Sequence, residues 1–323
     1  MRAPNRRTVI AGALAAALPA WGLAQSFPSK PIRIVVPFGP GGIADLVART
    51  VAQKLSEQLR QGVVVENKPG AGGVVAGDLV AKAEPDGHTL LLMSNGTAVS
   101  STLFKSLPFD AQKDFAPVVT LGTFDIAVLT AANGRFRSMK ELLAHAQANP
   151  GKLNVATINV GSTQHLSAEL IKTSLGLDFQ VVPFNGSPAV LTALRGGQVD
   201  AAVEILGPML PQIASKAVQP LAVMGARRAA ALPDVPTMAE SGAAGFDASS
   251  WNALAAPART PPAVIATLNR EVNKLLADPA VRKQLMDLNV TPRGGTPAQL
   301  AELLASETRR WGEVIVRAKV PRQ

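Results

Sequence analysis

Glycine-rich turns at the starts of expected helices are the sequence features best suited to bind a small ligand. Residues 39–42 (GPGG) separate an apolar run at 32–36, expected to be a strand, from a helical pattern at 43–60. Residues 69–73 (PGAGG) open the next helix in the same way. Such turns leave the first backbone N–H groups of a helix unpaired, and these groups bind a carboxylate as well as a phosphate. Neither turn continues into the Gly-Lys-Ser/Thr of a P-loop, so the sequence predicts general anion-binding turns.

Two turns of the same type lie in the second half of the chain. Residues 161–163 (GST) precede a helix expected at 164–175, and helix capping alone accounts for a Ser-Thr pair at this position. The turn at 185–188 (NGSP) favours a ligand-binding role for both turns, because several helix N-termini would then face one cleft. His165, one turn into its helix, is either a structural hydrogen-bonding residue or part of the pocket wall.

The first turn also fits a dinucleotide-binding fingerprint. Gly39, Gly41 and Ala44 match G-x-G-x-x-A, and Glu66 ends the next strand, roughly where a ribose-binding acid is expected. Asp45 speaks against this interpretation, because its charge in the first helical turn competes with a pyrophosphate for the helix N-terminus. An exported NAD(P)-dependent oxidoreductase nevertheless stays open as the alternative function.

Residues arranged for catalysis are scarce. The three histidines, His88, His145 and His165, form no spacing motif, and neither a Gly-x-Ser-x-Gly elbow nor a His-Glu-x-x-His sequence occurs. Glu204 ends an apolar strand and can serve there as a base or as a salt-bridge partner at a cleft rim. The sequence predicts neither a metal site nor a bound cofactor.

Composition excludes several other classes of protein. The 323 residues include no Cys, which rules out disulfides, thiolate metal sites and a cysteine-linked lipid anchor. Aromatic residues make up only 4%, and the basic residues behind the net charge of +9 are scattered, so no nucleic-acid surface is expected. Residues 1–24 have the basic start, short apolar run and small-residue end of an export signal, for Sec or twin-arginine export. We therefore expect a soluble, exported protein.

Short β-branched runs that alternate with amphipathic helices predict an α/β fold. We expect two lobes, each a mixed sheet flanked by helices, with a hinge and a ligand cleft between them. Residues 25–122 plus 249–323 would form the first lobe and residues 123–248 an inserted second lobe. The helices at 262–277 and 297–317 have no expected strands of their own, so they should pack back on the first sheet.

The motifs taken together resemble a known family, the Bug-type periplasmic solute-binding receptors of tripartite tricarboxylate transporters. The resemblance covers essentially the whole chain after the export signal. The matching segments, in order, are residues 36–42 (VPFGPGG) with Asp45, 66–73 (ENKPGAGG), 85–90 (PDGHTL), 107–110 (LPFD), 161–166 (GSTQHL), 196–200 (GGQVD), 232–237 (LPDVPT) and 255–257 (AAP).

This resemblance implies a two-lobed Venus-flytrap receptor, not an enzyme, that binds a small organic carboxylate in the periplasm and delivers it to a membrane permease. A chemoreceptor domain without a permease is a weaker alternative, and we expect a monomer. The ligand-binding residues implied by the resemblance are Gly41, Gly42, Asp45, Asn95, Thr97, Gly161, Ser162, Thr163, His165, Gly186, Ser187 and Glu204.

The sequence departs from the family pattern at two positions. Asn185 stands where the family commonly has a lysine, which weakens the case for a highly charged tricarboxylate. Glu204 and Ile205 replace an Asp-Asn pair. A glutamate beside a bound carboxylate would repel it unless the ligand carries an amine or the side chain faces away.

Overall fold

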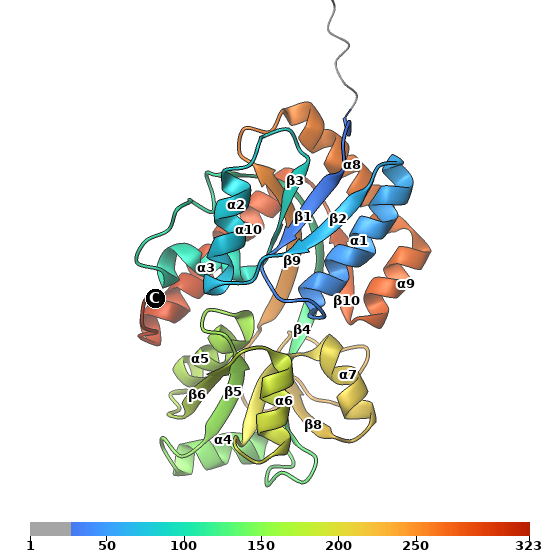
Figure 1. Cartoon of the computed structure of the whole chain (residues 1–323). Coiled ribbons are helices and arrows are strands. Elements are labelled where there is room, and N and C mark those ends of the chain that lie inside the picture. The colour runs from blue at the N-terminus through green and yellow to red at the C-terminus, as the bar shows by residue number, and fades with distance from the viewer. Residues whose placement is uncertain (1–26) are drawn as a thin grey trace, which may run out of the picture.

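Two α/β units, one above the other in Figure 1, make up the molecule. The computed structural model describes residues 27–323, so the export signal expected at residues 1–24 lies outside this part of the chain. Within residues 27–323, no helix combines the length and the apolar character that crossing a membrane requires.

The first unit, drawn uppermost in Figure 1, is built on a mixed sheet with strand order β2-β1-β3-β9-β4, and β10 also pairs with β4. Strands β1 to β3 are parallel, whereas β9 and β10 run antiparallel to the strands they pair with. The strands are β1 (Ile32–Val36), β2 (Val63–Asn67), β3 (Thr89–Met93), β4 (Phe115–Ala131), β9 (Ser249–Pro257) and β10 (Val290–Gly294). The helices of this unit are α1 (Ile43–Leu59), α2 (Val74–Ala81), α3 (Asn95–Leu103), α8 (Pro262–Ala277), α9 (Pro279–Asp287) and α10 (Pro297–Arg317), with a short 3₁₀ turn, η1 (Ala71–Gly73), before α2.

The second unit uses the last part of β4 in its own sheet, in which β8 and β7 flank β4 and β5 and β6 follow. Strands β5, β6 and β7 are parallel, and both neighbours of β4 are antiparallel to it. The further strands are β5 (Asn154–Ile158), β6 (Gln180–Phe184), β7 (Ala201–Ile205) and β8 (Val218–Val223). The helices are α4 (Met139–Ala148), α5 (Thr163–Leu175), α6 (Ser187–Arg195) and α7 (Leu206–Ala214).

Strand β4 belongs to both sheets. It pairs with β9 as far as Asp125, and from Ile126 onward it pairs with β7 and β8. Strand β9 begins at Ser249, which lies opposite Asp125, so the chain crosses between the units twice at neighbouring positions. The two crossings are therefore hydrogen-bonded strands that lie side by side.

The expectation that the last helices lack strands of their own is wrong. Strand β9 precedes α8, and β10 lies between α9 and α10. Alanine is a weak strand former, and β9 contains three alanines with every residue after Ser249 buried, which removes the alternating pattern that marks an exposed strand. Helices α8 and α10 do match the ranges expected from their proline-marked starts.

Helices α3 and α10 pack into the cores of both units. In α10, Leu300 and Leu304 join the cluster that contains Leu91 and Ala253 of the first sheet. The second half of α10 instead joins the core that lies under α5 in the second unit, together with Val99 and Leu103 of α3. The α10 residues in that core are Trp311, Val314 and Ile315. The two units are thus joined by apolar packing as well as by two strands.

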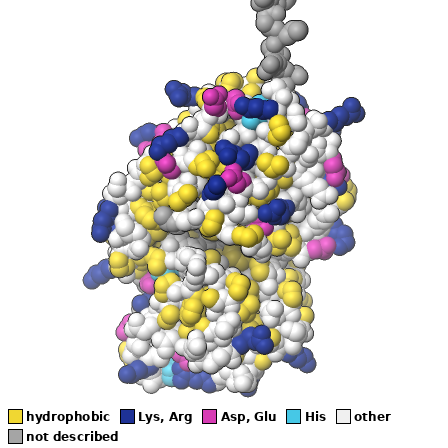
Figure 2. Space-filling model, in the orientation of Figure 1, with side chains coloured by type: hydrophobic (Ala, Val, Ile, Leu, Met, Phe, Trp, Pro, Cys, Tyr) yellow, Lys and Arg dark blue, Asp and Glu magenta, His cyan; other side chains and the backbone are white. Residues whose placement is uncertain are grey.

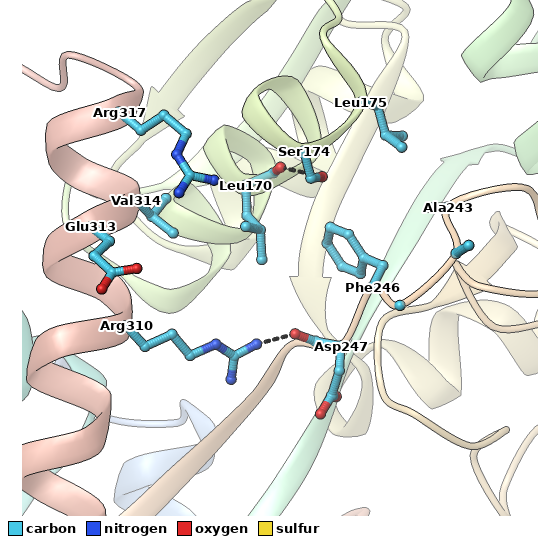
Figure 3. A pocket seen from close by; sticks show the side chains of 12 residues that line it. Leu170, Ser174, Leu175, Ala243, Phe246, Asp247, Arg310, Glu313, Val314 and Arg317 are labelled. Carbon is cyan, nitrogen blue, oxygen red and sulfur yellow. Dashed lines mark hydrogen bonds between the residues drawn. The ribbon is translucent and has the colours of Figure 1, made fainter.

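A cavity of about 230 Å³ lies where α10, α5 and the segment 243–247 meet (Figure 3). Arg310 of α10 donates to the backbone oxygen of Asp247, two residues before β9 begins. Leu170, Phe246 and Val314 contribute apolar lining. The hydrogen bond from Arg310 to Asp247 connects α10 to the segment just before β9, where the chain crosses between the units.

Gly161 allows the loop before α5 to approach α3 closely. Its φ is +82°, and a Cβ built on it would lie only 2.1 Å from Leu103 Cδ2. Gly207, at the start of α7, approaches the backbone oxygen of Leu288 in the same manner, with a Cβ distance of 2.1 Å. Glycines therefore permit both close approaches between the units.

Replacing Gly161 by alanine should destabilise the protein by about 3 kcal/mol, because the methyl group meets Leu103 and the residue keeps a left-handed backbone. Gly176→Ala is the matched control, since this helix cap has φ +63° and no atom within 4 Å of the added Cβ. Gly176→Ala should lower the free energy of unfolding by about 1 kcal/mol. Urea unfolding measures both, and equal losses would contradict the packing argument.

Candidate functional site

The carboxyl ends of the parallel strands in both sheets point toward the region between the units (Figure 1). Helices α1, α5, α6 and α7 follow these strand ends, so their N-termini lie around the same region. Figure 2 shows the surface hollowed in a band between the two units. A crevice at the carboxyl ends of parallel strands is the usual ligand site of α/β folds.

The turn before α1 is held in place by a buried carboxylate. Asp45 accepts hydrogen bonds from the Gly41 N–H (2.9 Å), Arg49 Nε (3.0 Å) and Asn67 Nδ2 (2.9 Å). Burial acts to raise the pKa of Asp45, but the hydrogen bonds outweigh it and hold the pKa below its ordinary value. Gly42 caps α1 without any side-chain hydrogen bond, which leaves N–H groups at the start of α1 for a ligand. Asp45 is therefore a positioning residue whose two oxygens are already occupied.

Glu66 is not placed to bind a ribose. Its carboxylate pairs with Arg33 Nη1 (3.0 Å) and Lys68 Nζ (2.8 Å). Gly41, the central glycine of the dinucleotide fingerprint, has its N–H occupied by Asp45. These contacts offer nothing in favour of the dinucleotide alternative.

The start of α3 is capped from within. Ser94 Oγ accepts from the Gly96 N–H (3.2 Å), and Thr97 Oγ1 accepts from the Ser94 N–H (3.4 Å). Asn95 is fully buried and donates to the backbone oxygen of Ser249 at the crossing (3.4 Å). Thr97 thus has a structural task, while Asn95 links α3 to the start of β9.

The start of α5 contains one capping residue and one contact between units. Ser162 Oγ accepts from the His165 N–H (3.1 Å), and Thr163 Oγ1 lies 3.0 Å from Ser250 Oγ of β9. Burial, with a further effect of Lys172, lowers the pKa of His165 to about 4. His165 is therefore a neutral imidazole near pH 7.

Glu204 is a fully buried carboxyl group at the end of β7. Its Oε2 accepts from Ser187 Oγ (3.0 Å), Gln164 Nε2 (3.3 Å) and the Ile205 N–H (3.3 Å). Its Oε1 is buried and has no hydrogen-bond partner among the described residues. Burial raises the pKa of Glu204 to about 7, although the three hydrogen bonds oppose the shift. This network brings the starts of α5 and α6 together at the end of β7.

Comparison with known proteins identifies the family. The model of the tripartite tricarboxylate transporter family receptor matches residues 47–320. The chain belongs to this receptor family. The chain is 40% identical, over 97% of its length and 94% of the relative's, to the "UPF0065 protein in tcbD-tcbE intergenic region" of Pseudomonas sp. (strain P51). It is 37% identical to Protein BugT of Bordetella pertussis, over 90% of each chain.

Solved structures of similar receptors have the same fold. R. palustris Rpa4515 with adipate is 31% identical, with a TM-score of 0.86 over 91% of this chain and 98% of that one. MatC from Rhodopseudomonas palustris with bound malate is 34% identical, with a TM-score of 0.82 over 90% and 100% of the two chains. The periplasmic binding protein BugD is 31% identical, with a TM-score of 0.84 over 92% and 100%. The expected two-lobed periplasmic-binding-protein fold is confirmed.

The helix starts at the receptor's crevice offer hydrogen-bond donors. Within the described residues, no side chain caps α1, α6 or α7, so backbone N–H groups in their first turns, such as those of Gly42 and Ser187, keep their capacity to bind an anion, although Pro188 and Pro208 contribute none. No group of three or more His, Cys, Asp or Glu side chains in residues 27–323 could hold a metal ion. The arrangement is suited to bind a group of carboxylate size.

Several buried polar residues beside the candidate site are absent from the set expected from the sequence. Gln164 lies inside the motif at 161–166, but a glutamine at a helix start does not by itself indicate a buried contact with Glu204. Ser250 and Asn252 are buried at the start of β9, and Asn252 Oδ1 has no hydrogen-bond partner among the described residues. Three polar residues at the start of an otherwise apolar strand were the available signal.

Glu204→Gln should change how the receptor's stability depends on pH. The folded protein keeps the Glu204 proton up to about pH 7, whereas the unfolded chain releases it near 4.5, so wild-type stability falls as pH rises through this interval. Glutamine does not ionise, so the Glu204→Gln variant lacks this loss of stability. The stability of the variant relative to wild type should increase by about 3 kcal/mol between pH 4.5 and pH 8.

Urea unfolding of both proteins at stepped pH measures this difference. The lowered pKa of His165 acts in the opposite direction, making both proteins less stable as pH falls from 6.5 toward 4, and it cancels in the comparison. A difference that does not vary with pH would show that Glu204 titrates normally.

Proposed function

We propose that this protein captures a small organic dicarboxylate between its two units in the periplasm and delivers it to a tripartite permease. The observation that carries the proposal is the set of uncapped starts of α1, α6 and α7 around one crevice. Backbone N–H groups bind carboxylate oxygens by charge-assisted hydrogen bonds without needing a basic side chain. Two similar receptors of known structure hold adipate and malate, both dicarboxylates.

The ligand-contacting residues we propose come from both units. Gly41 and Gly42 form the turn of the first unit, with Asp45 keeping it in shape. Asn95 lies near the crossing. In the second unit Gly186 and Ser187 form the turn before α6, and His165 and Glu204 lie beside or beneath the ligand. Gly161, Ser162, Thr163 and Thr97 act mainly through packing and caps that fix the walls.

We further propose that ligand binding closes the crevice. The moving bodies are residues 25–122 with 249–323 and residues 123–248. They pivot where the paired strands β4 and β9 pass from one unit to the other. Closure removes water, which strengthens carboxylate–amide hydrogen bonds, and the ligand's preference for the closed form drives it. Because α3 and α10 pack into both cores, the motion is a small slide around them.

The remaining parts of the proposal concern where and how the receptor works. It is exported by the Sec or the twin-arginine route, is not lipid-anchored and acts as a monomer. It is not an enzyme, uses no cofactor and binds no nucleic acid. Its one required partner besides the ligand is the periplasmic face of a permease.

Thermal shift and calorimetry on residues 25–323 test the proposal. The panel is malate, adipate, citrate, acetate, amino acids and NAD(P). A dicarboxylate should stabilise the protein by about 2.7 kcal/mol at a hundredfold excess over its Kd, and NAD(P) should not. Stabilisation by NAD(P) but by no carboxylate would overturn the receptor assignment and restore the oxidoreductase alternative.

Gly42→Pro isolates the contribution of one backbone N–H. Gly42 has φ −78°, which proline accommodates, and a Cβ at Gly42 would have only one atom, Gly39 O at 4.0 Å, within reach. Gly42→Ala is the matched control because it keeps the N–H. Calorimetry should show about tenfold weaker dicarboxylate binding for the proline variant and little change for alanine. Equal affinity of the two variants would remove this N–H from the site.

A further inference from the structure

Glu204 is a buried acid without a cation. It is fully buried, and all the hydrogen bonds that it accepts come from uncharged donors: Gln164, Ser187 and the Ile205 N–H. A buried carboxylate without a counter-ion is unfavourable, and it becomes more so when another negative charge approaches through a medium of low dielectric constant.

The two oxygens of Glu204 are not equivalent. All three donors converge on Oε2, whereas Oε1 is buried with no hydrogen-bond partner in residues 27–323. A carboxylic acid needs one acceptor oxygen and one oxygen that carries the proton. The contacts therefore leave Oε1 as the place for a proton, while Oε2 keeps its three donors.

The elements packed around Glu204 carry few ionisable groups. Strand β5 and helix α7 have none, and α6 has only Arg195 at its far end. On α5, His165 follows Gln164 and is neutral above about pH 4. Glu169 and Lys172 lie further along α5, where Lys172 Nζ is 3.9 Å from Glu169 Oε2.

One acidic side chain lies on the strand opposite Glu204. Ala127 of β4 pairs with Glu204, and Asp125 is two residues earlier on the same strand. Burial raises the pKa of Asp125, and the charge of Asp247 raises it further. Asp125 is therefore the group whose titration must be separated from that of Glu204 in any experiment.

We propose that Glu204 takes up one proton from solvent, onto Oε1, when an anionic ligand binds, and is a neutral carboxylic acid in the ligand-bound receptor. The inference rests on the proposed function. Glu204 lies beneath the starts of α6 and α7, so a carboxylate bound at those N-termini brings its negative charge close to that of Glu204. Taking up a proton removes this repulsion and resolves the conflict expected from a glutamate beside a bound carboxylate.

Proton uptake makes ligand affinity depend on pH. When only the protonated receptor binds, Kd is constant at acidic pH and then increases up to tenfold per pH unit above the pKa of the free acid, about 7. Affinity for a dicarboxylate should therefore be about tenfold weaker at pH 8 than at pH 6. A receptor of this kind holds its ligand more tightly in acidic surroundings.

Calorimetry on residues 25–323 at pH 8 tests the proposal, with malate and adipate as probes and phosphate, HEPES and Tris as buffers. The dependence of the observed heat on the buffer's ionisation enthalpy gives the number of protons taken up. Wild type should take up close to one proton per ligand at pH 8 and only about a tenth of a proton at pH 6, where both probes are mostly dianions. This measurement needs no variant, so it does not depend on whether a substituted protein folds.

Variants assign the proton to a residue. Glu204→Gln, a neutral isostere, should bind without proton uptake, with a Kd that does not change between pH 6 and 8. Glu169→Gln and Asp125→Asn are controls that remove other carboxyls of raised pKa, and both should keep the wild-type uptake.

Three outcomes would overturn the inference. Binding without proton uptake in wild type contradicts it while leaving the receptor function intact. Uptake that persists in Glu204→Gln, or disappears in Asp125→Asn alone, assigns the proton elsewhere. Absence of binding across the whole carboxylate panel refutes the proposed function, and the inference is lost with it.

Discussion

The structure depends on one continuous strand. Strand β4 has neighbours in the first sheet up to Asp125 and in the second from Ile126, so neither sheet is complete without it. Because β9 begins opposite Asp125, the second crossing is hydrogen-bonded to the first. The two crossings can bend together but cannot separate without breaking backbone hydrogen bonds. The relative orientation of the two walls of the crevice is therefore set by the geometry of a single ladder.

Apolar packing adds a second constraint on that geometry. The two halves of α10 are buried in different cores, and α3 joins them on the same side of the molecule. Apolar contacts are not directional, so they tolerate a small slide but resist wide separation of the units. The closure we propose would therefore be a small movement of the two units as bodies, in which each helix start keeps its place within its own unit.

The parts of this architecture that could be predicted from sequence are those determined locally. The turn at 39–42, the range of α1 and the proline-marked starts of α8 and α10 follow from turn chemistry and helical periodicity within a few residues. Strand β9 could not be predicted because alanine has little strand propensity of its own, and β10 could not because Pro292 argues against a strand unless it lies at a sheet edge, as β10 does beside β4. The burial of Glu204 could not be predicted either, because the residues that donate to it, Gln164 and Ser187, come from separate helices.

Two acids near helix starts show why such a site cannot be understood from residue types alone. Asp45 and Glu204 each accept a backbone N–H and a side-chain amide, yet only Asp45 has a cation, Arg49, in contact. Asp45 therefore stays charged and holds the turn of the first unit in one shape across the physiological pH range. Glu204 has no such partner, so its charge responds to whatever enters the crevice. The charge at the wall formed by the first unit is therefore constant, whereas the charge of Glu204 in the second unit depends on the ligand.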